Sequence, residues 1–429
     1  MEKLNFGLGH FAPWLKAPPV VAKRHFYCAA RDADEGSSNS EQARTFVLQT
    51  LEILERLVGF PTISADSNLA LIAFVEDFLH NAGFVCRRFP DAEGRKAALF
   101  ASRGPLDMAG VLLSAHSDVV PVDGQVWASD PFHLIERNGR LHGRGAADMK
   151  GFLASMLAAA GRSSRRALSA PLHLAISYDE EIGCVGVRPM LDELARQGVK
   201  PRLCLIGEPT GMRVATGHKG KVSLRATCRG TAAHSAAAPL ALNALHLAAD
   251  LLASIRRIQS EIATTGARDL DYDVPYTTLH AGVLRGGTSL NIVPDRAMLD
   301  FEIRYLANDD PDMILAALAK DVAAIVASYK PRFAEAAVDI DLRNRYPGLA
   351  IASGCAEVIG LQEMLGRTDT IKVAFGTEAG LFHQRLGVPA IVCGPGSMEQ
   401  GHKADEYIER SQVEGCDAFL DHLIASIAS

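Results

Sequence analysis

The chain of 429 residues is long for a single hydrophobic core and predicts two or three domains. Hydrophobic residues make up 48% of it and charged residues 22%, which is typical of a soluble globular enzyme. The net charge of −6 without a long basic run argues against a nucleic-acid partner, and because no apolar run reaches about 18 residues, we predict no membrane span.

Eight cysteines are scattered along the chain, and none of them forms a Cys-x-x-Cys pair. Most lie in apolar runs, which favours small buried hydrophobic residues over disulfides or a zinc ribbon. We therefore expect a reducing, cytoplasmic location.

Residues 1–44 differ in composition from the rest of the chain. They contain several prolines, a short basic cluster and a polar run over 34–40. Their apolar part is too short and too broken for a signal peptide. We expect an N-terminal extension here, either mobile or packed as an arm on the surface.

Between Thr45 and residue 206, helical and strand-like patterns alternate. Helices are expected at 45–58, at 68–82, after Gly151 and at 185–197, and strands at 84–89, at 97–102, through His116, at 171–178 and at 202–206. This alternation predicts an α/β fold with a mainly parallel, mixed sheet that has helices on both faces. Because such a sheet binds ligands at the carboxyl ends of its strands, the polar residues that follow those strands should gather at one edge.

The pattern changes from about Met212 onward. The expected order is a strand at 222–228, a helix at 238–258, strands at 276–285 and 297–305, a helix at 311–328 and a strand at 337–342. This β-α-β-β-α-β order is typical of the ferredoxin-like unit. We therefore predict an inserted α+β domain at 213–345 between two parts of a catalytic domain, at 45–212 and 346–429. The second part should hold a helix at 355–365, short strands at 371–375 and 389–393, and a last helix at 412–427.

Many of the polar residues near the ends of the predicted strands can bind metal ions. They are His116, Asp118, Asp148, Asp179, Glu180, Glu181, Glu208 and His402. No arginine is expected close by, so converging carboxylates would repel one another and lose their charge unless divalent ions lie between them. Imidazole and carboxylate ligands without thiolate suit Zn²⁺, and also Co²⁺ or Mn²⁺. A pair of ions sharing one carboxylate can activate a water molecule, so the pattern predicts a metal-dependent hydrolase.

Four motifs of the chain carry a resemblance to a known family. They are Ser114–Asp118, Gly143–Gly151, Asp179–Gly183 and Gly207–Thr210. In this order, and around an inserted domain of the expected pattern, they resemble the M20-type family of co-catalytic metallopeptidases and aminoacylases. The resemblance extends from about residue 45 to the C-terminus.

Three further motifs are most similar to the acetylornithine deacetylase branch of that family: Gly217–Gly220, Gly394–Ser397 and Gln400–Tyr407. The resemblance implies a hydrolase of linear amides that removes the N-acetyl group from N²-acetyl-L-ornithine, a step of arginine biosynthesis. It also implies that the inserted domain is a lid and dimerisation domain, which makes the protein a homodimer.

The resemblance assigns two divalent ions, most often zinc and alternatively cobalt, to five residues. Asp148 is expected to bridge the ions, with His116 and Glu208 completing one site and Glu181 and His402 completing the other.

Three more residues are assigned catalytic roles by the resemblance. Glu180 is expected to be the general base, since two adjacent glutamates cannot easily face one ion and one of them stays free to carry a proton. Asp118 is expected to lie behind His116. His234 is expected to reach the partner subunit's site and to stabilise the oxyanion.

Substrate contacts are expected from Asn291, Arg304 and Thr377, and Arg304 can bind an α-carboxylate through its forked guanidinium group. Lys219 is expected to lie in a solvated turn.

Several alternatives stay open on the sequence. Within the enzyme class they are a succinyl-diaminopimelate desuccinylase, an N-acetylcitrulline deacetylase and another aminoacylase or dipeptidase. An enzyme that works with a single ion is also compatible with the sequence. A binding protein without activity is disfavoured, because all five ligand positions and Glu180 are filled.

Overall fold

The computed structural model describes residues 49–64 and 66–429. The extension expected over 1–44, Cys28 within it and the start of the first predicted helix lie outside these residues. The described part of that helix covers 49–58. None of the helices in the described ranges combines the length and the apolar character that a membrane span requires.

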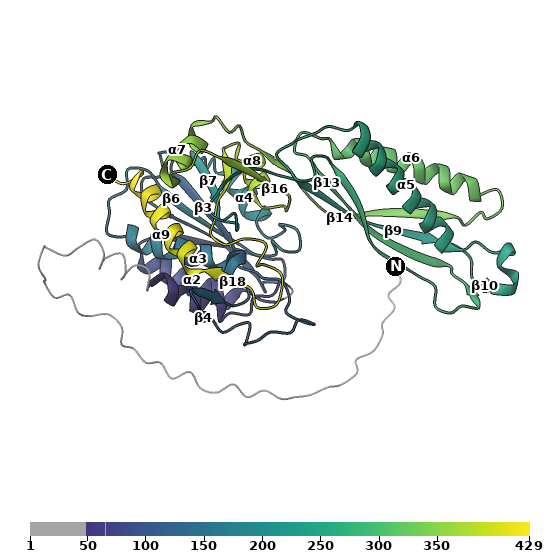
Figure 1. Ribbon diagram of the computed structural model, residues 1–429, viewed down its shortest axis with the longest axis horizontal. Coiled ribbons are helices and arrows are strands. Elements are labelled where there is room, and N and C mark those ends of the chain that lie inside the picture. The colour runs from purple at the N-terminus through teal and green to yellow at the C-terminus, as the bar shows by residue number, and fades with distance from the viewer. Residues whose placement is uncertain (1–48, 65) are drawn as a thin grey trace, which may run out of the picture. The chain divides into compact units, whose positions relative to one another are not determined.

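A nine-stranded sheet forms the centre of the larger α/β part of the described chain (Figure 1). Its strands are β1 (Val85–Pro90), β2 (Ala97–Arg103), β3 (Val111–His116), β6 (Leu172–Ser177), β7 (Leu203–Ile206), β8 (Val214–His218), β15 (Leu349–Ala350), β16 (Thr370–Val373) and β17 (Ala390–Val392). The order is β1-β2-β6-β3-β7-β17-β8-β15, with β16 paired to β8. The central strands β6, β3, β7 and β17 are parallel, whereas the pairs β1–β2, β2–β6, β17–β8 and β8–β15 are antiparallel.

Helices cover both faces of this sheet. They are α2 (Leu69–Asn81), α3 (Gly151–Ser163), α4 (Arg188–Arg196), α7 (Ala356–Leu365), α8 (Ala379–Leu386) and α9 (Arg410–Ala425). One hydrophobic core joins the helix at 49–58 and α2, α3, α7 and α9 to one face of the sheet, and a second core joins α4 and α8 to the other. Neighbouring residues of β3 belong to opposite cores, since Leu112 packs in the second and Leu113 in the first. The predicted mixed α/β fold with a mainly parallel central sheet is thereby confirmed.

Residues 220–346 form a separate antiparallel sheet with two helices. Its main elements are β9 (Gly220–Arg229), α5 (Ala244–Thr265), β11 (Thr278–Gly286), β13 (Arg296–Tyr305), α6 (Pro311–Tyr329) and β14 (Ala337–Tyr346). The strand order is β11-β13-β9-β14, which is the order of a ferredoxin-like sheet. The buried positions of β9 and β13 alternate, because one face packs against α5 and α6 and the other does not.

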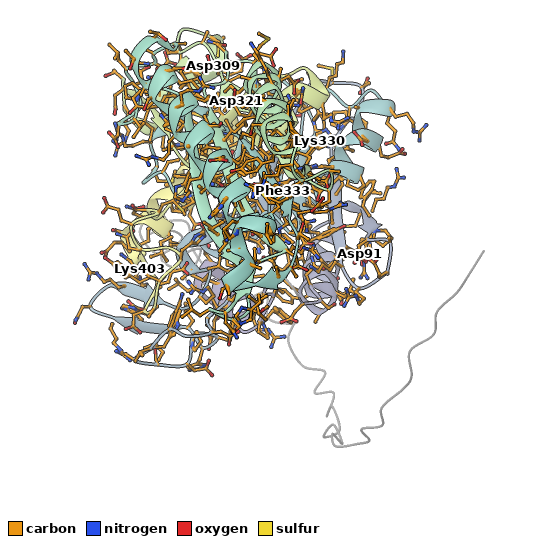
Figure 2. All side chains as sticks on the ribbon, turned by 90° about the vertical axis from the view of Figure 1, so that its right-hand side faces the viewer. Asp91, Asp309, Asp321, Lys330, Phe333 and Lys403 are labelled. Carbon is orange, nitrogen blue, oxygen red and sulfur yellow. The ribbon has the colours of Figure 1, made fainter. Side chains whose placement is uncertain are left out.

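Figure 2 labels three residues along α6: Asp309 two residues before the helix begins, Asp321 within it and Lys330 directly after its last residue. Asp310 caps this helix by accepting a hydrogen bond from the backbone N–H of Asp312.

The helix predicted at 238–258 begins later than expected, at Ala244, and ends later, at Thr265. Pro239 lies in a short 3-10 segment at Ser235–Leu240, and Asn243 caps the true start by accepting from the N–H of Leu245. The apolar pattern before Asn243 therefore belongs to a different local structure.

Seven short strands were not predicted. They are β8 and β15 of the central sheet, and β4 (Ile135–Arg137), β5 (Arg140–His142), β10 (Ala233–His234), β12 (Ile292–Val293) and β18 (Tyr407–Glu409). Strands β18, β5 and β4 form a small sheet in which Tyr407 lies opposite His142. This pairing places the segment before Tyr407 beside the segment after His142, and the two segments carry His402 and Asp148.

Candidate metal centre

Asp148 lies at the centre of a group of imidazoles and carboxylates. Its Oδ1 is 3.2 Å from Nε2 of His116, and its Oδ2 is 3.0 Å from Nε2 of His402. The side chain is almost fully buried, with 5% of its surface exposed. The two oxygens of one carboxylate therefore face two different imidazoles, as a ligand shared by two ions must do.

Two sets of potential ligands share this carboxylate. In each set the ligand atoms lie within 4.8 Å of one another; the first contains His116, Asp148 and Glu208, and the second contains Asp148, Glu181 and His402. The first set is buried, whereas the His402 side chain is 44% exposed. Nε2 of His402 is 3.0 Å from Oε2 of Glu181. The second set is therefore the one open to solvent.

The parallel strands bring three of these residues to one edge of the sheet. His116 is the last residue of β3, Glu181 lies in the segment after β6, and Glu208 lies just after β7. Gly207 has no room for a side chain, because the ring of Phe152 lies against its Cα. The polar residues therefore meet at the carboxyl ends of the strands, as the sequence predicts.

His116 is oriented by the main chain of Asp118. Its Nδ1 donates to the Asp118 carbonyl oxygen at 2.9 Å, which leaves Nε2 free as a ligand atom. The Asp118 carboxylate accepts instead from Ser64 Oγ at 2.7 Å and from the backbone N–H groups of Glu180 and Glu181 at 3.1 and 3.3 Å. Asp118 does lie behind His116, as predicted, but its carboxylate fixes the segment that carries the two glutamates.

Glu180 belongs to neither ligand set, although it lies beside both. Its Oε1 accepts a hydrogen bond from the Cys184 thiol at 3.3 Å. Burial raises the pKa of Glu180 well above its usual value; His116 opposes this shift and Glu181 adds to it. A carboxylate of raised pKa next to a reaction centre is suited to accept and return a proton.

The electrostatics of the two sets fit a pair of divalent cations. Burial raises the pKa of Glu208 well above its usual value and that of Glu181 to about 7, and Asp148 adds to both shifts. Hydrogen bonds to Asp148 and Glu181 raise the pKa of His402 to about 10. The carboxylates of the two ligand sets would therefore be stabilised in their charged form by positive charge placed between them. The donors are nitrogen and oxygen atoms without thiolate, a set that suits Zn²⁺, Co²⁺ or Mn²⁺.

Two cations lie at the edge of the centre. Asp179 was expected among the converging carboxylates, but its Oδ1 is paired with Nζ of Lys96 at 2.6 Å. Arg144 forms a buried ion pair with Glu406, whose carboxylate also accepts from the N–H of Asp148, and so does not neutralise the carboxylates of the two ligand sets. Lys96 and Arg144 therefore neutralise two carboxylates at the edge of the centre and leave the two ligand sets uncompensated.

Comparison with known proteins gives the relationship of the chain. Residues 112–426 match the model of the peptidase family M20/M25/M40. The chain belongs to this family. It is 31% identical over 382 residues to the acetylornithine deacetylase of Proteus mirabilis (strain HI4320), in a match that covers 87% of this chain and 95% of that protein.

Solved structures of the M20 family share the fold at lower sequence identity. The M20 family metallo-carboxypeptidase Sso-CP2 from Sulfolobus solfataricus is 19% identical with a TM-score of 0.72, over 88% of this chain and 98% of that one. The Bacillus subtilis YXEP protein, described as a dinuclear metal binding peptidase from the M20 family, is 14% identical with a TM-score of 0.60, over 90% and 99% of the two chains. As an M20 family member, the chain is an enzyme that acts on amides.

The four remaining predicted site residues of this M20 chain lie in other surroundings. His234 and Asn291 are exposed; Nδ1 of His234 accepts from the N–H of Ala236 at 3.1 Å, and Oδ1 of Asn291 accepts from Ser289 Oγ at 2.6 Å. Among the described residues, neither side chain hydrogen-bonds to a member of the two ligand sets. Strand β10, which carries His234, lies at the end of the inserted sheet opposite the start of β9 (Figure 1).

Arg304 and Thr377 are less exposed. The guanidinium group of Arg304 donates from Nε to Glu302 at 2.9 Å and from an Nη to the Tyr346 hydroxyl at 3.1 Å. Thr377 is buried, and its Oγ1 accepts from the N–H of Ala379 at 3.0 Å, at the start of α8.

Proposed function

We propose that this M20 enzyme is a dinuclear, zinc- or cobalt-dependent amidohydrolase that removes the N-acetyl group from N²-acetyl-L-ornithine, giving ornithine and acetate in arginine biosynthesis. The observation that supports the dinuclear centre is the placement of the two Asp148 oxygens, one toward His116 and one toward His402. The choice of substrate is supported by the similarity to acetylornithine deacetylase, which extends over 95% of that relative.

In the proposed mechanism, the ions would activate the amide and the water, and Glu180 transfers the proton. Ions held by the two ligand sets would polarise the amide carbonyl and lower the pKa of the attacking water. Glu180 takes a proton from this water and delivers it to the amine as the amide bond breaks. The Asp118 carboxylate holds the backbone of Glu180 and so fixes the position of the base. The segment after β6 thus carries an ion ligand and the base side by side.

The inserted domain is proposed to bind the substrate and to act as the lid. Arg304 can form two parallel hydrogen bonds to an α-carboxylate, and its bond to Tyr346 holds the guanidinium group in place. Asn291 and Thr377 are proposed as further contacts, from the inserted domain and from the start of α8. The insertion was predicted to begin at 213, but residues 214–218 form β8 of the central sheet, so residues 219–348 are proposed to close over the rest of the chain when substrate binds.

A panel of substrates tests the proposed specificity. We expect the kcat/KM for N²-acetyl-L-ornithine to exceed those for N-succinyl-diaminopimelate and N-acetyl-L-citrulline by about 10-fold or more, because a pocket built for one side chain penalises polar groups that it cannot pair. The three values are to be measured side by side on the zinc- and cobalt-loaded enzyme. A higher value for one of the other two substrates would replace acetylornithine as the substrate but leave the hydrolytic mechanism intact.

The position of His234 supports a homodimer formed through the inserted domain. Strand β9 has ten residues, so its far end lies roughly 30 Å from its start near the catalytic part, and His234 follows that far end. Apolar side chains near His234 are unusually exposed, among them Leu290 at 100% and Leu240 at 79%. We therefore propose that His234 serves the active site of the partner subunit and stabilises the oxyanion there.

Mixed dimers test this role of His234. Glu180→Gln and His234→Asn chains, each inactive as homodimers, are to be co-expressed with different affinity tags and purified through both tags. If His234 acts across the dimer, the heterodimer contains one complete site and should show about half of the wild-type activity. A heterodimer as inactive as its two parents would mean that His234 serves its own chain, whereas a fully active His234→Asn homodimer would show that His234 has no catalytic role.

A further inference from the structure

A buried ion pair lies directly behind the proposed bridging ligand. The side chains of Arg144 and Glu406 are each 1% exposed, and an Nη of Arg144 is 2.7 Å from Oε2 of Glu406. The other oxygen of Glu406 accepts from the backbone N–H groups of Ala147 and Asp148, at 2.9 and 3.1 Å. One carboxylate therefore fixes the main chain at the residue that both ligand sets share.

The same pair extends to the segment that carries His402. The second Nη of Arg144 donates to Oε1 of Gln125 at 2.6 Å, and the Gln125 amide has a longer contact of 3.4 Å with the carbonyl oxygen of His402. Arg144 also approaches the carbonyl oxygen of Lys403 at 3.4 Å. The network thus joins the segments of Asp148 and His402, which are more than 250 residues apart in the sequence.

The two ligand sets depend on this network to different degrees. His116 is the last residue of β3 and pairs with β6, and Glu208 follows Gly207, whose N–H donates to the carbonyl oxygen of Ser114 in β3. His402 lies in a loop outside the strands, with a positive φ of 59° and an exposed side chain. This loop is held by contacts with other loops, among them those with Arg144 and Gln125 and the hydrogen bond from the N–H of Ala128 to Asp405.

A buried ion pair contributes little to stability on balance, because removing two charges from water costs about as much as their attraction returns. Its value lies in fixing one arrangement of the chain. We propose that Glu406, together with Arg144, is a positioning residue that sets the affinity of the second ligand set, Asp148–Glu181–His402, for its ion. This inference rests on the proposed function, since it takes the two sets to be ion sites.

The experiment measures ion binding and not turnover. The full-length chain and its Glu406→Gln variant are equilibrated in buffers of fixed free Zn²⁺, and the bound zinc per chain is determined by elemental analysis. We expect the affinity for one of the two ions to fall by about 10- to 100-fold, as for other groups that orient metal ligands, while the affinity for the other ion, whose set also contains His116 and Glu208, falls much less.

A second buried carboxylate provides the control. Asp417 lies in the core of the same domain, where it accepts from Thr50 at 2.7 Å and faces Arg162. Asp417→Asn should lower the melting temperature but leave both zinc affinities unchanged. If Glu406→Gln binds both ions as tightly as the wild type, or weakens the binding of both ions equally, the inference is wrong.

Gln125→Ala decides the question if Glu406→Gln does not fold. It leaves the Arg144–Glu406 ion pair in place and removes the link from Arg144 through Gln125 to His402, so it should weaken the binding of the same ion, by a smaller factor. If the Gln125→Ala variant binds both zinc ions with the affinity of the wild type, the inference is wrong. A wild-type chain that binds fewer than two ions would instead contradict the proposed dinuclear centre.

Discussion

Replacing Glu180 by glutamine is expected to lower kcat by about 10²- to 10⁴-fold while the bound metal stays in place. The amide cannot take a proton from the attacking water, yet it has nearly the shape of the carboxylate. Metal content should not change, because Glu180 belongs to neither ligand set and its Oε1 is occupied by the Cys184 thiol. Steady-state kinetics with N²-acetyl-L-ornithine and elemental analysis of the same preparation provide the two measurements.

The matched control for this prediction is Glu180→Asp, which keeps the carboxylate but withdraws it by one methylene group. It should retain more activity than the glutamine variant, because a base can still act through a longer contact or through a water molecule. Equal rates for the wild type and Glu180→Gln would remove Glu180 from the role of base. Loss of zinc from Glu180→Gln would instead make Glu180 an ion ligand.

Asp148→Asn is expected to lower the bound zinc from two ions per chain to one at most, and to lower kcat/KM by more than about 100-fold. An asparagine side chain offers one oxygen and one NH₂ group, and the NH₂ group cannot bind a cation. At least one of the two positions occupied by Oδ1 and Oδ2 of Asp148 therefore loses its ligand. Because groups that only orient ligands already change affinity by about 10- to 100-fold, loss of a direct ligand should exceed that range.

Glu208→Gln and Glu181→Gln are the appropriate comparisons, since each of these residues belongs to only one ligand set. Each variant should lose one ion and keep the other, whereas only Asp148→Asn should affect both. Elemental analysis after dialysis should find one zinc ion per chain in Glu208→Gln and in Glu181→Gln, and less than one in Asp148→Asn. An Asp148→Asn chain that retains two ions would contradict the shared carboxylate on which the proposed mechanism rests.

The sequence was most informative where the chain is most regular. Strands β3, β6 and β7 are buried along their whole length, so their sequences are mainly apolar and the polar residues that follow them mark the sheet edge. Since parallel strands bring those ends together, the meeting of His116 and Glu208 could be predicted without any knowledge of distances.

Contacts between distant segments could not be predicted in the same way. Lys219 was expected in a solvated turn, but it is buried, and its Nζ donates to the carbonyl oxygens of Val274 and Tyr276 at 2.9 and 2.6 Å. Nothing around Lys219 in the sequence indicates a partner 55 residues away. Glu406 was not predicted as a site residue for the same reason, since its partner Arg144 lies 262 residues earlier.

The short strands escaped prediction because of their length. Strands β4, β5 and β18 have three residues each, which is too few for an alternating pattern to stand out. Their small sheet nevertheless decides which loops become neighbours. The residues of the two potential ligand sets could therefore be predicted from the sequence, whereas the groups that fix their positions could not.

The backbone leaves the central sheet after His218 and re-enters it at Leu349, and these two residues are direct partners in the pairing of β8 with β15. Residues 219–348 are thus spliced into what is otherwise a simple hairpin. A tight turn in their place would keep Gly217 opposite Ala350 and preserve the register of the remaining strands. Evolution can therefore lengthen or remodel parts of this module to suit new molecules, because both potential ligand sets and Glu180 lie outside it.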